Sequence, residues 1–328
     1  LTFGFGDAIE ETFYFYEKTV GFAKELSGSD DYPTTDQMKN AIEKTGVREK
    51  SKNAFEKAFG LALCDVGKIT NSPSSLLDRL SWELGEDKDF WAAGMYAGWP
   101  LRVTPLRKRP FIKLHNRSYC FDIHNLFDNI YRKIENLVLE SKPEGRETWN
   151  VIRKDASEKL SLNYLASLLP GAKIYSPAYY GKKGFRAETD GLIIYDDVLL
   201  IVEVKSGALD TGSPLLDFEK HQKKLVELIE NPATQAKNFR EYLISNKKIE
   251  IYDGNHRNSV VLLNLKAEWF RKIYQCTVSV DNLTHLTSRA RKLSSLGIQV
   301  HTPANWSISL DDLRVYAEVF ESPLQFLH

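Results

Sequence analysis

Four charged side chains in the C-terminal half of the chain have the types and spacing of a metal-assisted catalytic site. Glu188 and Asp190 precede one apolar run, and Glu203 and Lys205 end the next one. A two-residue hairpin turn at 196–197 places Asp190 directly opposite Glu203 and brings all four side chains onto one strand face. Opposed Cβ atoms in such a pair lie ~4.5–5.5 Å apart, so the two carboxylates can bind one hard divalent cation.

The same register predicts what each member of the set does. Without a cation the two close carboxylates repel, and one of them holds a proton. Lys205 then offsets the carboxylate charge, points at a phosphate or helps to activate a water. Glu188 lies opposite Lys205 and either pairs with it or joins the metal site. An ordinary ion pair between Glu203 and Lys205 is the alternative.

The elements that position this set are two strands in the middle of a covered sheet, because both faces are apolar between Leu192 and Val202. Charge appears only at one strand end, where burial is expensive unless the groups are paired or bind a metal. Around these strands, periodicity and turn signals predict helices at 152–169 and 218–245, the second interrupted near 231–232, and strands at 172–180, 185–195, 198–205, 260–265 and 276–280. The order α-β-β-β-α-β predicts an α/β fold, a mixed sheet flanked by helices. Ser309 to Asp312 forms a capping-box pattern that predicts a final helix to about Phe320.

At these residues the chain resembles the PD-(D/E)xK nuclease superfamily. Asp190 matches the family's first Asp, and Glu203-Val204-Lys205 matches its (D/E)xK triplet, whereas Thr189 stands where the family has Pro. The resemblance implies a restriction-endonuclease-like fold. It also implies that Asp190 and Glu203 bind Mg²⁺ or Mn²⁺, with the Val204 carbonyl as a further ligand.

Two accessory residues extend the resemblance, which covers roughly residues 150–265. Glu158, on the helix before the sheet, matches an upstream acidic residue that many members use as a metal ligand. Gln235, on the helix after the triplet, resembles the catalytic-site glutamine of the recombination-nuclease branch. Plain surface roles for both residues stay open. The C-terminal half also resembles bacterial multidomain proteins that carry such a nuclease module.

Basic side chains near these elements are candidates for binding the phosphates of a nucleic acid. In the C-terminal half they are Lys182, Lys183, Arg186, Lys237 and Arg240, and in the N-terminal half they are Arg107, Lys108 and Arg109. The last three belong to a stretch, 102–117, with six basic residues and no acidic one. Solvated turns and helix surfaces are the alternative explanation of these positions.

Length and composition limit the function classes. The 328 residues include 44 Lys+Arg and 44 Asp+Glu, and 42% are hydrophobic, which indicates globular domains and excludes a disordered chain, a rod or a collagen-like repeat. No apolar run approaches the ~18 residues of a membrane-spanning helix, so we expect no membrane partner. Three widely spaced cysteines without C-x-x-C fit a reduced cytoplasmic protein. The absence of G-x-S-x-G, P-loop and H-E-x-x-H motifs argues against serine hydrolases, P-loop NTPases and zinc proteases.

The pattern predicts three regions: a mostly helical domain over 1–145, a nuclease domain over 146–275 and a C-terminal strand and helix extension over 276–328. The N-terminal domain is expected to contain helices at 8–23, 35–43, 50–63 and 75–84 and core aromatics Trp82, Phe90, Trp91, Tyr96 and Trp99. A chain that starts at Leu1 without Met and ends in an apolar pattern is expected to be part of a longer protein.

The resemblance therefore implies a Mg²⁺-dependent deoxyribonuclease, with phage defence or restriction as its setting. Two-strand cleavage needs two sites, which favours a homodimer or a larger assembly. Two alternatives remain. One is a catalytically silent nucleic-acid-binding or assembly module with a nuclease-like fold, and the other is a ribonuclease.

Overall fold

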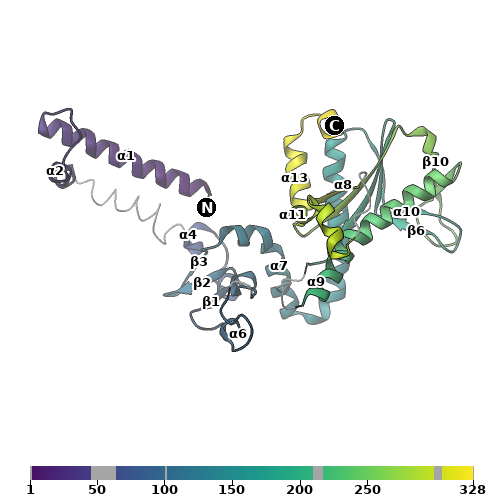
Figure 1. Cartoon of the computed structure of the whole chain (residues 1–328), viewed down its shortest axis with the longest axis horizontal. Helices are drawn as coiled ribbons and strands as arrows, with labels where there is room; N and C mark the ends of the chain where they lie inside the picture. Colours follow the sequence, from purple (N-terminus) through teal and green to yellow (C-terminus); the bar gives the residue numbers. More distant parts are fainter. Residues whose placement is uncertain (1, 46–63, 100–101, 210–216, 299–304, 328) are drawn as a thin grey trace. The chain divides into compact units, whose positions relative to one another are not determined.

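The computed structural model describes residues 2–45, 64–99, 102–209, 217–298 and 305–327. The chain divides into two compact units, residues 1–141 and 142–328, which are described separately (Figure 1). The helix predicted at 50–63 lies outside the described residues. Within those residues, no helix is both long enough and apolar enough to cross a membrane.

The first unit combines helices with a small sheet. Its helices include α1 (Thr2–Ser27), α2 (Thr35–Thr45), α4 (Val66–Ile69), α5 (Ser74–Arg79), α6 (Lys88–Trp91) and α7 (Ile123–Ser141). Its sheet has the order β1-β2-β3, with β1 (Ser81–Glu83) parallel to β2 (Phe111–Leu114) and β2 antiparallel to β3 (Arg117–Tyr119). The helix predicted over 75–84 therefore ends at Arg79, because the next residues pair with β2.

The aromatic residues predicted for the core of this unit are only partly internal. Trp91 and Trp99 are 70% and 60% exposed, so that prediction was wrong for both. The buried cluster is instead aliphatic around one aromatic ring and consists of Val66, Leu77, Leu80, Phe111, Cys120 and Leu137.

The second unit contains a five-stranded mixed sheet in the order β12-β11-β8-β7-β4. The strands are β4 (Lys173–Tyr175), β7 (Gly191–Tyr195), β8 (Val198–Lys205), β11 (Lys272–Ser279) and β12 (Asn305–Ser309). β8, β11 and β12 are mutually parallel, whereas β7 is antiparallel to β8 and β4 is antiparallel to β7. The predicted mixed α/β class is confirmed at this level.

A second sheet in the same unit is antiparallel, with the order β10-β9-β5-β6. Its strands are β5 (Ala178–Tyr180), β6 (Ala187–Thr189), β9 (Ile249–Tyr252) and β10 (Val261–Leu265). The single strands predicted at 172–180 and 185–195 are thus each divided between the two sheets. Pro177 has no N–H for a ladder, and at Asp190 the chain passes from one sheet to the other.

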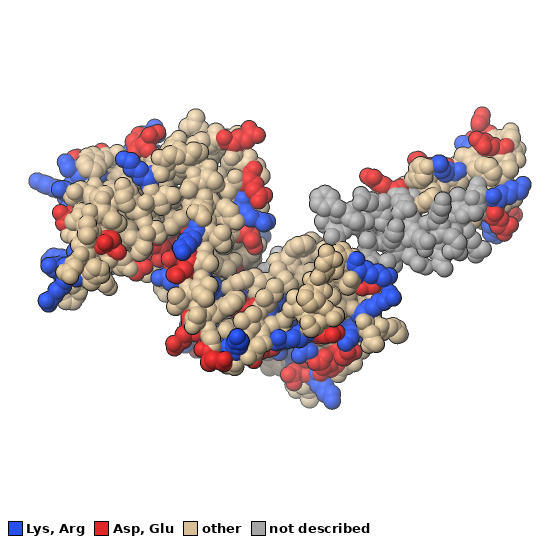
Figure 2. Space-filling view, turned by 180° about the vertical axis from the view of Figure 1, so that it is seen from behind, with Lys and Arg blue, Asp and Glu red and all other residues tan. Residues whose placement is uncertain are grey.

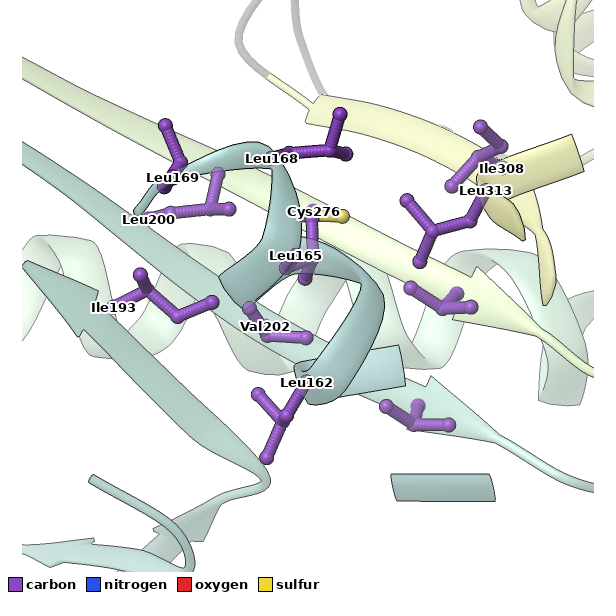
Figure 3. Close-up of a cluster of buried hydrophobic side chains, with 12 residues drawn as sticks. Leu162, Leu165, Leu168, Leu169, Ile193, Leu200, Val202, Cys276, Ile308 and Leu313 are labelled. Atoms are coloured by element: carbon purple, nitrogen blue, oxygen red, sulfur yellow. The ribbon is translucent and has the colours of Figure 1, made fainter. Parts of the chain in front are cut away.

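Helices cover both faces of the five-stranded sheet (Figure 1). On one face, α8 (Arg146–Leu168) and α13 (Leu310–Val319) cover a leucine-rich core in which Leu162 and Leu165 lie near Val202 and Cys276 (Figure 3). The Ser309 hydroxyl accepts a hydrogen bond from the Asp312 N–H at 3.1 Å, as the capping pattern predicts.

The other face is covered by α10 (Asn231–Ser245), whose Phe239 and Leu243 are fully buried against Leu199 and Ile201. α9 (Phe218–Leu225) runs into α10 through a π-helical turn, Val226–Glu230. The interruption expected near 231–232 is therefore a widening of the helix, and the chain stays helical across it.

Candidate functional site

The hairpin of β7 and β8 sets the position of the site. Tyr195 pairs with Val198 and Gly191 with Val202, which is the register predicted from a two-residue turn. The ladder ends there, so the direct strand pair predicted between Asp190 and Glu203 does not form. The physical reason is that the residues before Asp190 form β6, which pairs with β5 in the other sheet.

The predicted pairing of Glu188 with Lys205 also fails for this reason. Glu188 lies opposite Tyr179 of β5, and the Tyr179 hydroxyl donates a hydrogen bond of 2.9 Å to its carboxylate. The two acidic residues of this segment nevertheless stay at one end of β8. Charge interactions connect Glu188 and Asp190 with Glu203.

Asp190 is held by the backbone of the neighbouring strand. Asp190 is only 7% exposed, and its Oδ2 accepts a hydrogen bond of 2.7 Å from the Val204 N–H. Burial raises the pKa of Asp190, while the Val204 N–H and the charge of Lys205 oppose the rise. Val204 thus positions the first carboxylate through its amide, while its side chain packs in the leucine-rich core.

Glu203 is the most unusual ionisable group of the site because it is only 2% exposed. Burial, followed by the charge of Asp190, raises its pKa from 4.5 to about 8. Lys205 and a hydrogen bond from Thr189 act in the opposite direction. At neutral pH and without a bound cation, Glu203 therefore carries a proton most of the time.

Lys205 and Gln235 come together from different elements. The Lys205 ammonium donates a hydrogen bond of 2.7 Å to the Gln235 side-chain oxygen, which connects β8 to α10. Both residues were candidates on the sequence, but their contact depends on the packing of α10 over the sheet. The amide fixes the direction of a long, flexible cation that otherwise samples many rotamers.

Glu158 on α8 supplies a third carboxylate. Burial and the nearby charge of Asp190 raise its pKa, and its Oε1 has no hydrogen-bond partner among the described residues. The ammonium of Lys154 lies 3.5 Å from Glu158 Oε1 and 3.6 Å from Glu188 Oε1. The lysine therefore connects the helix to β6 as a counter-cation for both carboxylates.

Sequence reasoning missed Lys154 and Tyr179. Lys154 precedes Glu158 by four residues, and this helix spacing alone predicts their ion pair. No local signal identifies Tyr179, because its contact with Glu188 depends on the pairing of β5 with β6.

The donor set fits a magnesium ion bound by few protein ligands. Within the described ranges, no three His, Cys, Asp or Glu side chains form a complete metal-binding group. Asp190 and Glu203 nevertheless offer hard oxygens with raised pKa values, and Glu158 has a buried oxygen without a hydrogen-bond partner. Mg²⁺ usually takes one or two carboxylates and keeps waters or phosphate oxygens in its other positions. Asp190 and Glu203 supply that number of carboxylates.

The basic candidates of this unit differ in how they are engaged. Lys182 and Lys183 are exposed in the turn between β5 and β6. Arg186 is used inside the protein, since its guanidinium stacks 3.4 Å over the Tyr252 ring and donates to the Gly254 carbonyl.

On α10, Lys237 lies 3.7 Å from Glu241. The Nε atom of Arg240 is buried and has no hydrogen-bond partner within the described ranges. Neither side chain is arranged as an exposed, free phosphate contact.

Half of the six basic residues in the stretch of the first unit are ion-paired with acidic neighbours. Arg109 pairs with Glu86 at 2.6 Å and lies over the Trp82 ring. The other ion pairs of the stretch are Lys113 with Asp78 and Glu83, and Arg117 with Asp65. Arg107 and Lys108 are the exposed candidates that make no ion pair with a described residue. Positive and negative side chains are interspersed over the visible surface (Figure 2).

Comparison with protein-family models, with curated proteins and with solved structures finds no match. The function of the site is therefore inferred from its own geometry.

Proposed function

We propose that this chain is a divalent-metal-dependent nuclease that hydrolyses phosphodiester bonds of DNA. The observation that carries the proposal is the buried pair Asp190 and Glu203, whose pKa values are both raised, beside the oriented ammonium of Lys205. Burying two carboxylates together is costly unless a cation compensates them, so such a pair is typical of a functional site.

The fold supports the same proposal at a finer level. The Glu203-Val204-Lys205 triplet ends β8, with the antiparallel β7 on one side and the parallel β11 on the other. α8 precedes the strands and supplies Glu158, and α10 follows them and supplies Gln235. Those placements agree with a restriction-endonuclease-like core.

Each side chain has a distinct role in this mechanism. Asp190 and Glu203 would hold the metal, and Glu158 would complete the acidic site. A metal bound there would supply Lewis acidity toward the phosphate and toward a water. Lys205, directed by Gln235, neutralises charge on the phosphate and orients the attacking water. Lys154 keeps the outer carboxylates Glu158 and Glu188 in place.

The test is cleavage of supercoiled plasmid and of labelled RNA in Mg²⁺, in Mn²⁺ and in EDTA. Lys205→Ala is compared with wild type, and Lys159→Ala is the matched control because Lys159 is an exposed lysine of the same unit. We expect metal-dependent nicking of the plasmid that falls by a factor of about 100 or more in Lys205→Ala and stays unchanged in the control.

Cleavage that persists in EDTA, or that is equal in Lys205→Ala and wild type, would contradict the proposal. Cleavage of RNA alone would replace the substrate by RNA. Metal-independent binding of DNA without turnover would assign the chain to the silent binding modules.

A further inference from the structure

The turn between β5 and β6 carries the most exposed large apolar side chain of the described residues. Phe185 is 90% exposed, and none of the described rings stacks on it. Burial of such a side chain is favourable, so its exposure leaves apolar contact area available to a ligand.

The turn has a defined shape. Gly181 and Gly184 have φ angles of +108° and +88°, which residues other than glycine rarely adopt. The Phe185 N–H donates a hydrogen bond of 2.9 Å to the Lys182 carbonyl. Arg186 fixes the base of the turn, because it stacks on Tyr252 and donates to backbone carbonyls of the loop after β9. The ring is therefore presented by an anchored hairpin.

The charge around the ring suits a polyanion. Lys182 and Lys183 are exposed beside Phe185, and neither forms an ion pair within the described part of the chain. No acidic residue occurs between Gly181 and Ala187. An exposed aromatic ring flanked by cations is the combination that binds a strand of nucleotides, with bases on the ring and phosphates on the lysines.

β6 connects this turn to the proposed catalytic carboxylates. Phe185 precedes Glu188 by three residues and Asp190 by five. At about 3.3 Å per residue for an extended chain, the Cα atom of Phe185 lies within roughly 10–17 Å of the Cα atoms of these two residues. That span corresponds to about three to five nucleotides at roughly 3.4 Å per nucleotide.

We propose that Phe185 stacks on an unpaired base, so that the enzyme selects nucleic acid with a single-stranded segment a few nucleotides from the cleaved bond. Inside a duplex both faces of each base are already stacked on neighbours, so the ring finds a free face only where the strand is unpaired. The inference rests on the proposed nuclease function and specifies its substrate class.

The test is binding in EDTA, where no cleavage occurs, to a single strand, a forked duplex and a fully paired duplex. We expect Phe185→Ala to weaken binding of the single strand and the fork by between about 5- and 150-fold, which is the range for loss of one stacked base. Binding of the paired duplex stays within about twofold, and Phe185→Trp restores the affinity. Trp269→Ala is the matched control, since Trp269 is an exposed aromatic residue of another loop.

A 2-aminopurine base placed along the unpaired strand gives a direct readout, because stacking on Phe185 quenches its fluorescence in wild type and not in Phe185→Ala. Equal loss of affinity for all three ligands, or no loss, would overturn the inference. If wild type still nicks plasmid in Mg²⁺, only the inference fails. If wild type neither binds nor cleaves nucleic acid, the proposed function fails with it.

Discussion

At the scale of the residue, Glu203 makes stability depend on pH. Its pKa rises from 4.5 to about 8 on folding, so the folded state keeps a proton that the unfolded state releases above 4.5. The free energy of unfolding therefore falls as pH increases between these two values.

We predict that Glu203→Gln is more stable than wild type in EDTA at pH 8, by up to roughly 3–4 kcal/mol, and similar to it near pH 4.5. Urea unfolding of both proteins across this range measures the difference. A constant difference at every pH would show that the carboxyl does not titrate as its burial requires.

The contact between Lys205 and Gln235 gives a second prediction at this scale. A hydrogen bond to a charged group contributes about 1.5–3 kcal/mol, so Gln235→Ala should reduce kcat about 10- to 100-fold. Mn²⁺ affinity, measured by calorimetry, should stay unchanged because Gln235 is not one of the proposed ligands. Gln235→Glu keeps an oxygen acceptor and should recover part of kcat. Loss of metal binding in Gln235→Ala would instead show that Gln235 helps to position the carboxylates.

At the scale of the element, the close contact of α8 with β7 sets the relation between Glu158 and Asp190. A Cβ added at Gly191 would lie 2.6 Å from Leu162 Cδ2, closer than Cβ atoms in proteins approach other atoms. Gly191→Ala should therefore force the Leu162 side chain or α8 to shift and destabilise the unit by about 1–3 kcal/mol.

Leu162→Ala removes the obstructing atoms, so we expect the double variant to lose less stability than the sum of the single variants. Chemical denaturation of the four proteins completes this double-mutant cycle. Strictly additive losses would show that α8 and β7 are not in close contact at Gly191.

Local pattern predicted much of this architecture because local physics determines it. The turn at 196–197 and the apolar runs beside it were sufficient for the register of β7 and β8, and the capping pattern at Ser309 predicted the start of α13. The change of sheet at Asp190 could not be predicted, because it depends on pairing with strands distant in sequence. The sequence predicted that Glu203 belongs to the site, but its depth of burial follows from the packing of α10 over the sheet.

At the scale of the whole molecule, the surface charge predicts how nucleic acid binding responds to salt. Net charge is zero, and three of the six basic residues at 102–117 are paired with acidic neighbours. Among the predicted phosphate-binding residues, Lys182, Lys183, Arg107 and Lys108 are exposed and make no ion pair with a described residue.

We predict that the affinity for nucleic acid depends only weakly on salt concentration, with a slope of log K against log[salt] of about −3 in EDTA. Lys182→Gln with Lys183→Gln should reduce its magnitude by roughly 1.5. Fluorescence anisotropy between low and moderate salt measures both slopes. A slope steeper than about −6 would show that a larger basic surface takes part.

The π-helical turn between α9 and α10 has a consequence for the way this site is built and varied. Each residue of an α-helix advances the chain by about 100°, so one extra residue in the turn rotates everything before it relative to everything after it. α10 is fixed on the sheet by Phe239 and Leu243, which keeps Gln235 at Lys205. The rotation therefore falls on α9, which carries Lys220, Lys223 and Lys224. Deleting a single residue from Val226–Glu230 would leave Gln235 in phase with Lys205 and turn the α9 lysines by a quarter turn or more. The orientation of α9 can therefore change without a change in that of α10 within one continuous helix.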